Sequence, residues 1–88
     1  MNTSQGNVAE LVTVNDVQFE ENVLHVQLSD GRRVSLPLDT AGWLGWLASA
    51  TLEQRAGWSI EPGGYAVYWE ELDDGIEVEH LLGLQPLS

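Results

Sequence analysis

Six carboxylates lie within ten residues of the sequence, and they are the first candidates for chemistry. They are Glu70, Glu71, Asp73, Asp74, Glu77 and Glu79. Several carboxylate oxygens can hold a hard cation, but the calcium-loop template, counted back from Gly75, places Leu72 at a ligand position and finds no glutamate at its end. We therefore expect no metal. Two interpretations stay open: an acidic face that binds a basic protein by charge complementarity, and a solvated turn that keeps the protein soluble.

A second group of residues suited to binding lies in the longest apolar run, Ala41 to Leu52. Trp43 and Trp46 share one apolar stripe at helical spacing, and a second stripe follows beside it, so a helix here is apolar nearly all round. One side would pack on a sheet, and the other could meet a partner or a second copy. Tryptophan is enriched at binding hot spots, but small domains also use it in their cores. Gly42 and Gly45 weaken the helix, which predicts a partly irregular segment.

Residues typical of catalysis are few. His25 falls on the polar face of its predicted strand and His80 lies beside a predicted terminal helix, and neither has a nearby serine in a recognisable nucleophile turn. The chain has no cysteine, which excludes thiol nucleophiles, disulfides and zinc ribbons. The pair Gly63-Gly64 lacks the strand–loop–helix context and the lysine of a phosphate-binding loop. We expect no enzyme activity, no catalytic residue and no cofactor.

The charge balance excludes several classes of partner. Fourteen acidic residues stand against three basic ones, all arginine, for a net charge of −11. A phosphate backbone would be repelled, so we expect no direct nucleic-acid binding. The longest apolar run is shorter than the about 20 residues that a membrane-spanning helix needs. The segment Met1 to Asn7 lacks the basic and apolar stretches of a signal peptide, and we expect a cytoplasmic protein without a membrane span.

The length of 88 residues predicts a single domain, because independent domains usually contain roughly 100–150 residues. An apolar fraction of 43% is enough to form one small core. We expect a flexible N-terminal lead-in over residues 1–10, the domain over residues 11–84 and a C-terminal tail over residues 85–88.

The first half of the chain has the alternation of apolar and polar residues that is typical of β-strands. Within residues 11–19 the apolar positions change face, and a bulge at Asn15-Asp16 would reconcile the two halves. Residues 23–28 alternate cleanly, and a third strand covers residues 34–38.

The turn between the second and third strands follows from their apolar faces. A two-residue loop would put Val34 on the wrong face of the sheet. A three-residue loop, Ser29-Asp30-Gly31 with Gly31 left-handed, places Val26 opposite Val34 and therefore matches the apolar faces. The longer loop is the prediction.

Helical signals begin after the third strand. Asp39 or Thr40 can cap a helix over residues 43–48, and Thr51 with Gln54 forms a capping box for a second helix that Gly57 closes as its C-cap. The remaining elements are strands at 58–61 and 65–69 joined by Pro62-Gly63-Gly64, an acidic loop at 70–74, the short segment 76–78 and a helix around Leu81-Leu82. The order β-β-β-α-β-β-α predicts a small α+β domain, with a mostly antiparallel sheet and helices packed on one face.

Three strings of the sequence carry a resemblance to a known family. They are Ser29-Asp30-Gly31-Arg32 before an apolar strand, Ala50 to Arg55 with Trp58, and the segment from Gly63 to Gly83 that contains Tyr68-Trp69-Glu70-Glu71-Leu72-Asp73-Asp74-Gly75. Together they resemble the bacterial domain-of-unknown-function family 2442 over residues 12–84. The resemblance implies a small α+β fold and no known catalysis. Two positions depart from the family pattern: Glu70 replaces a usual proline, and Gly42-Trp43-Leu44 replaces a Pro-Arg-Leu type of segment.

The resemblance also suggests a function. Family members occur alone, fused to helix-turn-helix DNA-binding domains, or beside a second small protein in gene pairs that resemble toxin–antitoxin modules. We therefore expect a non-catalytic, acidic protein-binding module, an antitoxin-like neutralising partner of a basic protein. The alternatives are a regulatory module that forms a homodimer through the Trp43–Trp46 surface, and an acidic mimic of nucleic acid. The expected partner-binding residues are Trp43, Trp46, Glu70, Glu71, Asp73 and Asp74.

Overall fold

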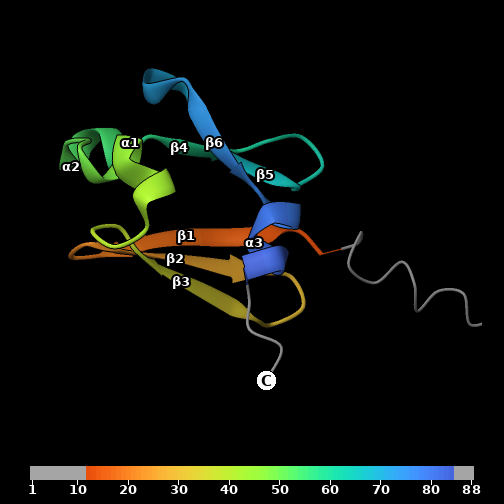
Figure 1. Ribbon diagram of the computed structural model, residues 1–88. Coiled ribbons are helices and arrows are strands. Elements are labelled where there is room, and N and C mark those ends of the chain that lie inside the picture. Colours follow the sequence, from red (N-terminus) through yellow and green to blue (C-terminus); the bar gives the residue numbers. More distant parts are fainter. Residues whose placement is uncertain (1–11, 85–88) are drawn as a thin grey trace, which may run out of the picture.

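The structure is a computed structural model that describes residues 12–84, and its strands form two three-stranded antiparallel sheets (Figure 1). Sheet A has the order β1-β2-β3, and its strands are β1 (Val14–Glu20), β2 (Val23–Leu28) and β3 (Arg33–Pro37). Sheet B has the order β4-β5-β6, and its strands are β4 (Trp58–Ile60), β5 (Ala66–Trp69) and β6 (Asp74–Glu77). The predicted α+β class is confirmed. The lead-in and tail that we expect at residues 1–10 and 85–88 lie outside the described residues.

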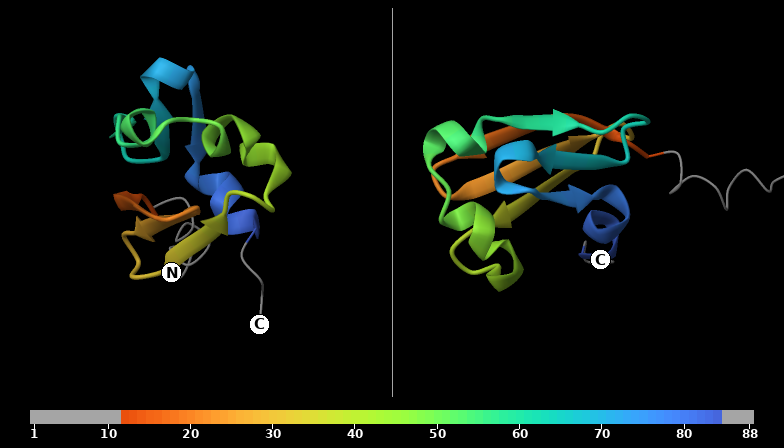
Figure 2. Two further views of the ribbon diagram at one scale, coloured as in Figure 1. Left: turned by 90° about the vertical axis from the view of Figure 1, so that its left-hand side faces the viewer. Right: turned by 90° about the horizontal axis from the view of Figure 1, so that it is seen from above.

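Short helices close the ends of the two layers. They are the 3-10 helix η3 (Gly42–Leu44), α1 (Gly45–Ala48), α2 (Leu52–Arg55), the 3-10 helix η4 (Glu70–Leu72) and α3 (Val78–Leu84). The sheets lie one above the other, with α1 and α2 at one end and α3 toward the opposite end (Figures 1 and 2). Within the part of the chain that the structure describes, no helix is long and apolar enough to cross a membrane.

The core lies between the two sheets, because each sheet buries the apolar side of its alternating pattern. It contains Val14, Val17, Leu24, Val26, Leu28, Val34, Leu36 and Leu38 from sheet A and its flanks, Val67, Trp69, Ile76 and Val78 from sheet B and its flank, and Leu44, Leu47 and Leu81 from the helices. The turn between β4 and β5 ties the two layers together, since the carbonyl of Gly64 accepts a 2.8 Å hydrogen bond from the backbone N–H of Val14.

The predicted strand details of sheet A are confirmed. The register between β1 and β2 shifts between Val14 and Asp16, which is the predicted bulge. Val14 before the bulge and Val17 after it are both buried. Val26 pairs with Val34, and Gly31 is left-handed with a φ of 94°. The three-residue loop therefore sets the register that the apolar faces require.

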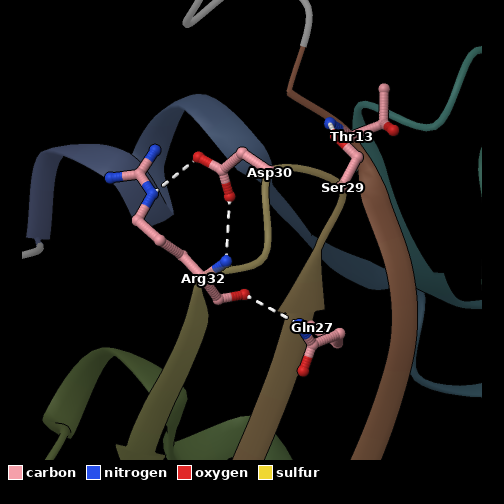
Figure 3. A network of polar contacts seen from close by, with 5 residues as sticks. All are labelled: Thr13, Gln27, Ser29, Asp30 and Arg32. Atoms are coloured by element: carbon pink, nitrogen blue, oxygen red, sulfur yellow. Dashed lines mark hydrogen bonds and ion pairs between the residues drawn. The ribbon is translucent and has the colours of Figure 1, made fainter.

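A polar network holds this hairpin loop in place (Figure 3). The carboxylate of Asp30 accepts hydrogen bonds from the backbone N–H of Arg32 at 3.0 Å and from its Nε at 2.7 Å. The backbone hydrogen bond is the main cause of a lowered pKa of Asp30, and the guanidinium lowers it further against the opposing effect of burial. Next to the loop, the amide of Gln27 donates to the carbonyl of Arg32, and Ser29 Oγ accepts from the N–H of Thr13.

Two predicted helix caps are wrong. Ala41 is the N-cap of η3 and makes no side-chain capping bond; the Thr40 hydroxyl donates to the carbonyl of Pro37 instead, because the chain turns back on Pro37 before the helix begins. Ala56, not Gly57, is the C-cap of α2. The capping box of Thr51 is confirmed. The predicted irregularity at the glycines is also confirmed, since the segment changes from a 3-10 helix to a four-residue α-helix.

Arg55 joins the helices to sheet A and is almost completely buried, with 6% of its surface exposed. Its Nε donates to the carbonyl of Leu47 at 3.2 Å and its Nη2 to that of Ala48 at 3.0 Å. Across the layer, Nη1 donates to the carbonyl of Glu21 at 3.4 Å and Nη2 to Asn22 Oδ1 at 3.1 Å. The guanidinium thus fixes the end of α1 against the β1–β2 turn.

Candidate functional site

An open groove of about 590 Å³ lies on the outer face of sheet B and is lined by aromatic and acidic side chains. We call it the sheet B groove, and its residues are Trp43, Glu61, Tyr65, Ala66, Val67, Tyr68, Gly75, Ile76, Glu77 and His80. Trp43 comes from η3 and His80 from α3, so two helices far apart in the sequence both contribute to it. Neither lysine nor arginine is among these lining residues.

The pairing of the strands arranges the floor of the sheet B groove in two rows. In one row Ala66 pairs with Glu77 on β6, and its carbonyl accepts a 2.9 Å hydrogen bond from the N–H of Glu61 on the other side. In the next row Tyr68 lies between Ser59 and Gly75. Two carboxylate side chains therefore flank a small alanine, and a tyrosine lies two residues farther along the same strand face.

Gly75 is required beneath the ring of Tyr68. A Cβ atom at Gly75 would lie 2.6 Å from the carbonyl oxygen of Val67 and 3.1 Å from the Tyr68 ring. Any other residue would displace the strand or the ring, because contacts of 2.6 Å lie well inside van der Waals distance. The lack of a Cβ at Gly75 therefore leaves room for the Tyr68 ring in the groove.

The two predicted tryptophans have different environments. Trp43 is 40% exposed and packs edge-to-face on His80, with 4.7 Å between the ring centroids. Trp46 is half-buried and packs edge-to-face on the buried Trp69, with 5.6 Å between the centroids. Trp43 therefore forms a wall of the sheet B groove, whereas Trp46 extends the core.

The acidic segment forms a compact turn next to the groove. Glu70 and Glu71 are exposed on η4, Asp73 is left-handed with a φ of 54°, and the exposed Asp74 begins β6. The Tyr68 hydroxyl donates a 2.5 Å hydrogen bond to Asp73 Oδ1. Through this bond the structure connects Asp73 to the groove that Trp43 lines, whereas Glu70, Glu71 and Asp74 are not among the lining residues.

The electrostatic environment of Tyr68 is strongly negative. The hydrogen bond to Asp73 is the main cause that raises the pKa of Tyr68 above its usual value of 10.0, and burial raises it further. The negative charges of Asp73, Glu61 and Glu70 act in the same direction. A phenolate there would be repelled by several carboxylates, and a cation would be attracted by them.

Sequence reasoning missed Tyr65, Tyr68, Glu61, Glu77 and His80 as site residues. The two-residue period of the predicted strands was a usable signal for two of them, because it places Glu61 on the same face as Ser59, and Tyr68 on the face opposite Val67 and Trp69. Trp43 was among the predicted binding residues, but its contact with His80 had no local signal, since it depends on how η3 and α3 approach each other.

His25 has a serine partner that the sequence did not predict. Its Nδ1 lies 2.7 Å from Ser35 Oγ and its Nε2 lies 3.1 Å from Glu20 Oε1, on the outer face of sheet A. His25 and Ser35 are directly paired across β2 and β3. Ser35 lies in mid-strand and not on the sharp turn that presents a serine nucleophile, so the geometry is that of a stabilising cross-strand pair.

A metal centre finds no support in residues 12–84, where no group of three His, Cys, Asp or Glu side chains is placed to hold an ion. The sheet B groove remains the arrangement best suited to binding. It combines exposed aromatic surface, which supplies contact area, with carboxylates that select for positive charge.

Comparison with known proteins agrees with the resemblance seen in the sequence. A family model described as protein of unknown function (DUF2442) matches residues 14–86. No curated protein matches the sequence significantly. The crystal structure of a protein of unknown function from Rhodospirillum rubrum is similar with a TM-score of 0.66 and 22% identity, covering 82% of this chain and 86% of that chain. The solution NMR structure of an uncharacterized protein from Chromobacterium violaceum is similar with a TM-score of 0.68 and 25% identity, covering 94% and 79% respectively.

Proposed function

This chain belongs to the DUF2442 family of proteins of unknown function, and we propose that it is a non-catalytic module that binds a basic protein through the sheet B groove. The observation that carries the proposal is the hydrogen bond between Tyr68 and Asp73. It joins an aromatic groove to the acidic turn in one continuous surface. Aromatic residues supply binding energy at interfaces, and clustered carboxylates accelerate the approach of a basic partner.

The net charge of −11 supports a basic partner rather than a neutral one, because complementary charge both speeds encounter and selects the partner. The neutralising role in a two-gene, toxin–antitoxin-like module is the finer part of the proposal. This role rests on the family resemblance alone. The proposed cytoplasmic location rests on the sequence alone. A homodimer and an acidic mimic of nucleic acid are the competing functions that the experiment must separate.

The test is affinity capture from nuclease-treated native lysate at low and high salt, with the mass of the complex measured. The groove variant is Glu61→Gln/Glu77→Gln, and the matched control is Asp16→Asn/Glu53→Gln, which removes the same charge outside the groove. We expect one stoichiometric basic protein that is lost at high salt and with the groove variant, and kept with the control.

Three results would contradict the proposal. A self-associated species without a second protein would indicate the regulatory dimer instead. A captured protein that DNA displaces at low salt would indicate the mimic. A partner that both double variants release equally would show that overall charge, and not the groove, is responsible.

A further inference from the structure

We infer that the sheet B groove binds an arginine side chain of the partner, with the guanidinium above Ala66 between the carboxylates of Glu61 and Glu77. This inference rests on the proposed function and deepens it, because it names the chemical group that is recognised. The occupant is a basic protein segment with an accessible arginine.

The first argument is that the groove, as residues 12–84 form it, is lined by carboxylates and by neither lysine nor arginine. Glu61 and Glu77 line it, and Asp73 and Glu70 add to the negative potential at Tyr68. The chain contains three arginines and no lysine. None of them lines the groove: Arg55 is buried between α1 and sheet A, Arg32 is bonded to Asp30, and Arg33 lies on the outer face of sheet A.

The second argument is geometric. Glu61 and Glu77 flank Ala66 on the two neighbouring strands, so their Cα atoms lie about 10 Å apart, twice the usual strand spacing. Ala66 carries only a methyl group, and it lines the groove together with both glutamates. A guanidinium carries five N–H donors that point outward in one plane, and it can therefore donate to both carboxylates at once.

The third argument distinguishes arginine from lysine. Tyr68 lies two residues from Ala66 on the same face, and Tyr65 and Trp43 supply further exposed ring surface, at 48% and 40% exposure. A guanidinium stacks on aromatic rings and is weakly hydrated, whereas an ammonium is a strongly hydrated point charge.

The test compares two synthetic peptides that are identical except that four arginines in one are four lysines in the other. Binding is followed by NMR amide shifts of the ¹⁵N-labelled full chain. We expect the arginine peptide to bind about fivefold or more tightly than the lysine peptide, with the largest shifts at Ala66, Tyr68 and Gly75. Glu61→Gln/Glu77→Gln should abolish this preference, and Asp16→Asn/Glu53→Gln should keep it.

A second variant, Ala66→Leu, fills the space between the carboxylates without changing charge, and it should weaken the arginine peptide more than the lysine peptide. Equal affinities with shifts in the groove would overturn the arginine inference and leave the proposed function intact. Shifts confined to other surfaces, or no binding of either peptide, would overturn both. A preference for arginine that survives in the Glu61→Gln/Glu77→Gln variant would overturn the assignment of these two carboxylates.

Discussion

The hydroxyl of Tyr68 on β5 donates a 2.5 Å hydrogen bond to Oδ1 of Asp73, which ends η4 in the left-handed conformation. Aspartate tolerates this conformation better than most residues, and the bond holds its carboxylate toward the groove. The bond links the acidic turn to the outer face of β5, so a substitution at Asp73 should affect Tyr68 in the sheet B groove.

Replacing the charge at Asp73 should lower the pKa of Tyr68. Asp73→Asn keeps a residue that accepts the left-handed conformation but removes the carboxylate that is the main cause of the raised pKa. A phenolate absorbance titration measures the change, with Asp16→Asn as a control that should have no effect. Because the pKa of Tyr68 is higher in the folded protein than its unfolded value of about 10.0, the protonated phenol stabilises the fold at pH values below 10.0. This contribution is lost as the pH rises through the folded pKa. Unchanged titration in Asp73→Asn would contradict this account.

Removal of the Arg55 guanidinium should destabilise the protein severely. Arg55→Met leaves the carbonyl of Ala48 without its guanidinium donor, whereas that of Leu47 keeps a 3.1 Å bond from the N–H of Ala50. It also removes the donors to the carbonyl of Glu21 and to Asn22 Oδ1, and the cation 5.7 Å from the Phe19 ring centroid. Each buried acceptor left unsatisfied costs about 1–3 kcal/mol, so we expect a loss of about 3 kcal/mol or more in urea unfolding.

Arg33→Met is the matched control, because Arg33 is exposed, and it should change the free energy of unfolding by about 0.5 kcal/mol or less. Similar losses in the two variants would mean that charge, rather than the buried bonds of Arg55, sets the stability.

Gly64 should not tolerate a side chain. Its φ is 83°, and a Cβ atom would lie 2.8 Å from Cβ of Thr13, so Gly64→Ala should cost about 1–3 kcal/mol from strain and steric overlap. Gly45→Ala is the control, since nothing lies within 4 Å of a Cβ there and alanine favours the helix by roughly 0.5–1 kcal/mol. Thermal unfolding should show opposite shifts of Tm. Equal shifts for the two variants would rule out this explanation.

The two tryptophans of the first helical segment should behave differently on truncation. Trp46→Ala removes a half-buried ring from its contact with Trp69 and should cost about 2–4 kcal/mol of unfolding free energy. Trp43→Ala removes a ring that is 40% exposed, so its effect on stability should be the smaller one and its effect on peptide binding the larger one. Urea unfolding and the NMR titration measure the two effects, and a reversed order would contradict the assignment of Trp43 to the groove.

The sequence by itself determined the local structure of this protein. The bulge in β1, the three-residue loop ending at Gly31 and the capping box of Thr51 were all predictable. Each follows from interactions among near neighbours: the dihedral limits of a left-handed residue, the two-residue period of a strand face and a side chain that caps its own helix.

Only the tertiary structure decided which residues form the groove. Whether Trp43 or Trp46 faces outward depends on how the short helices pack against sheet B, and the placement of Glu61 and Glu77 beside Ala66 depends on the pairing of three strands. The burial of Arg55 likewise depends on carbonyls from distant segments. These are contacts between segments far apart in the chain, and local periodicity specifies which face of an element is buried but not which other element covers it.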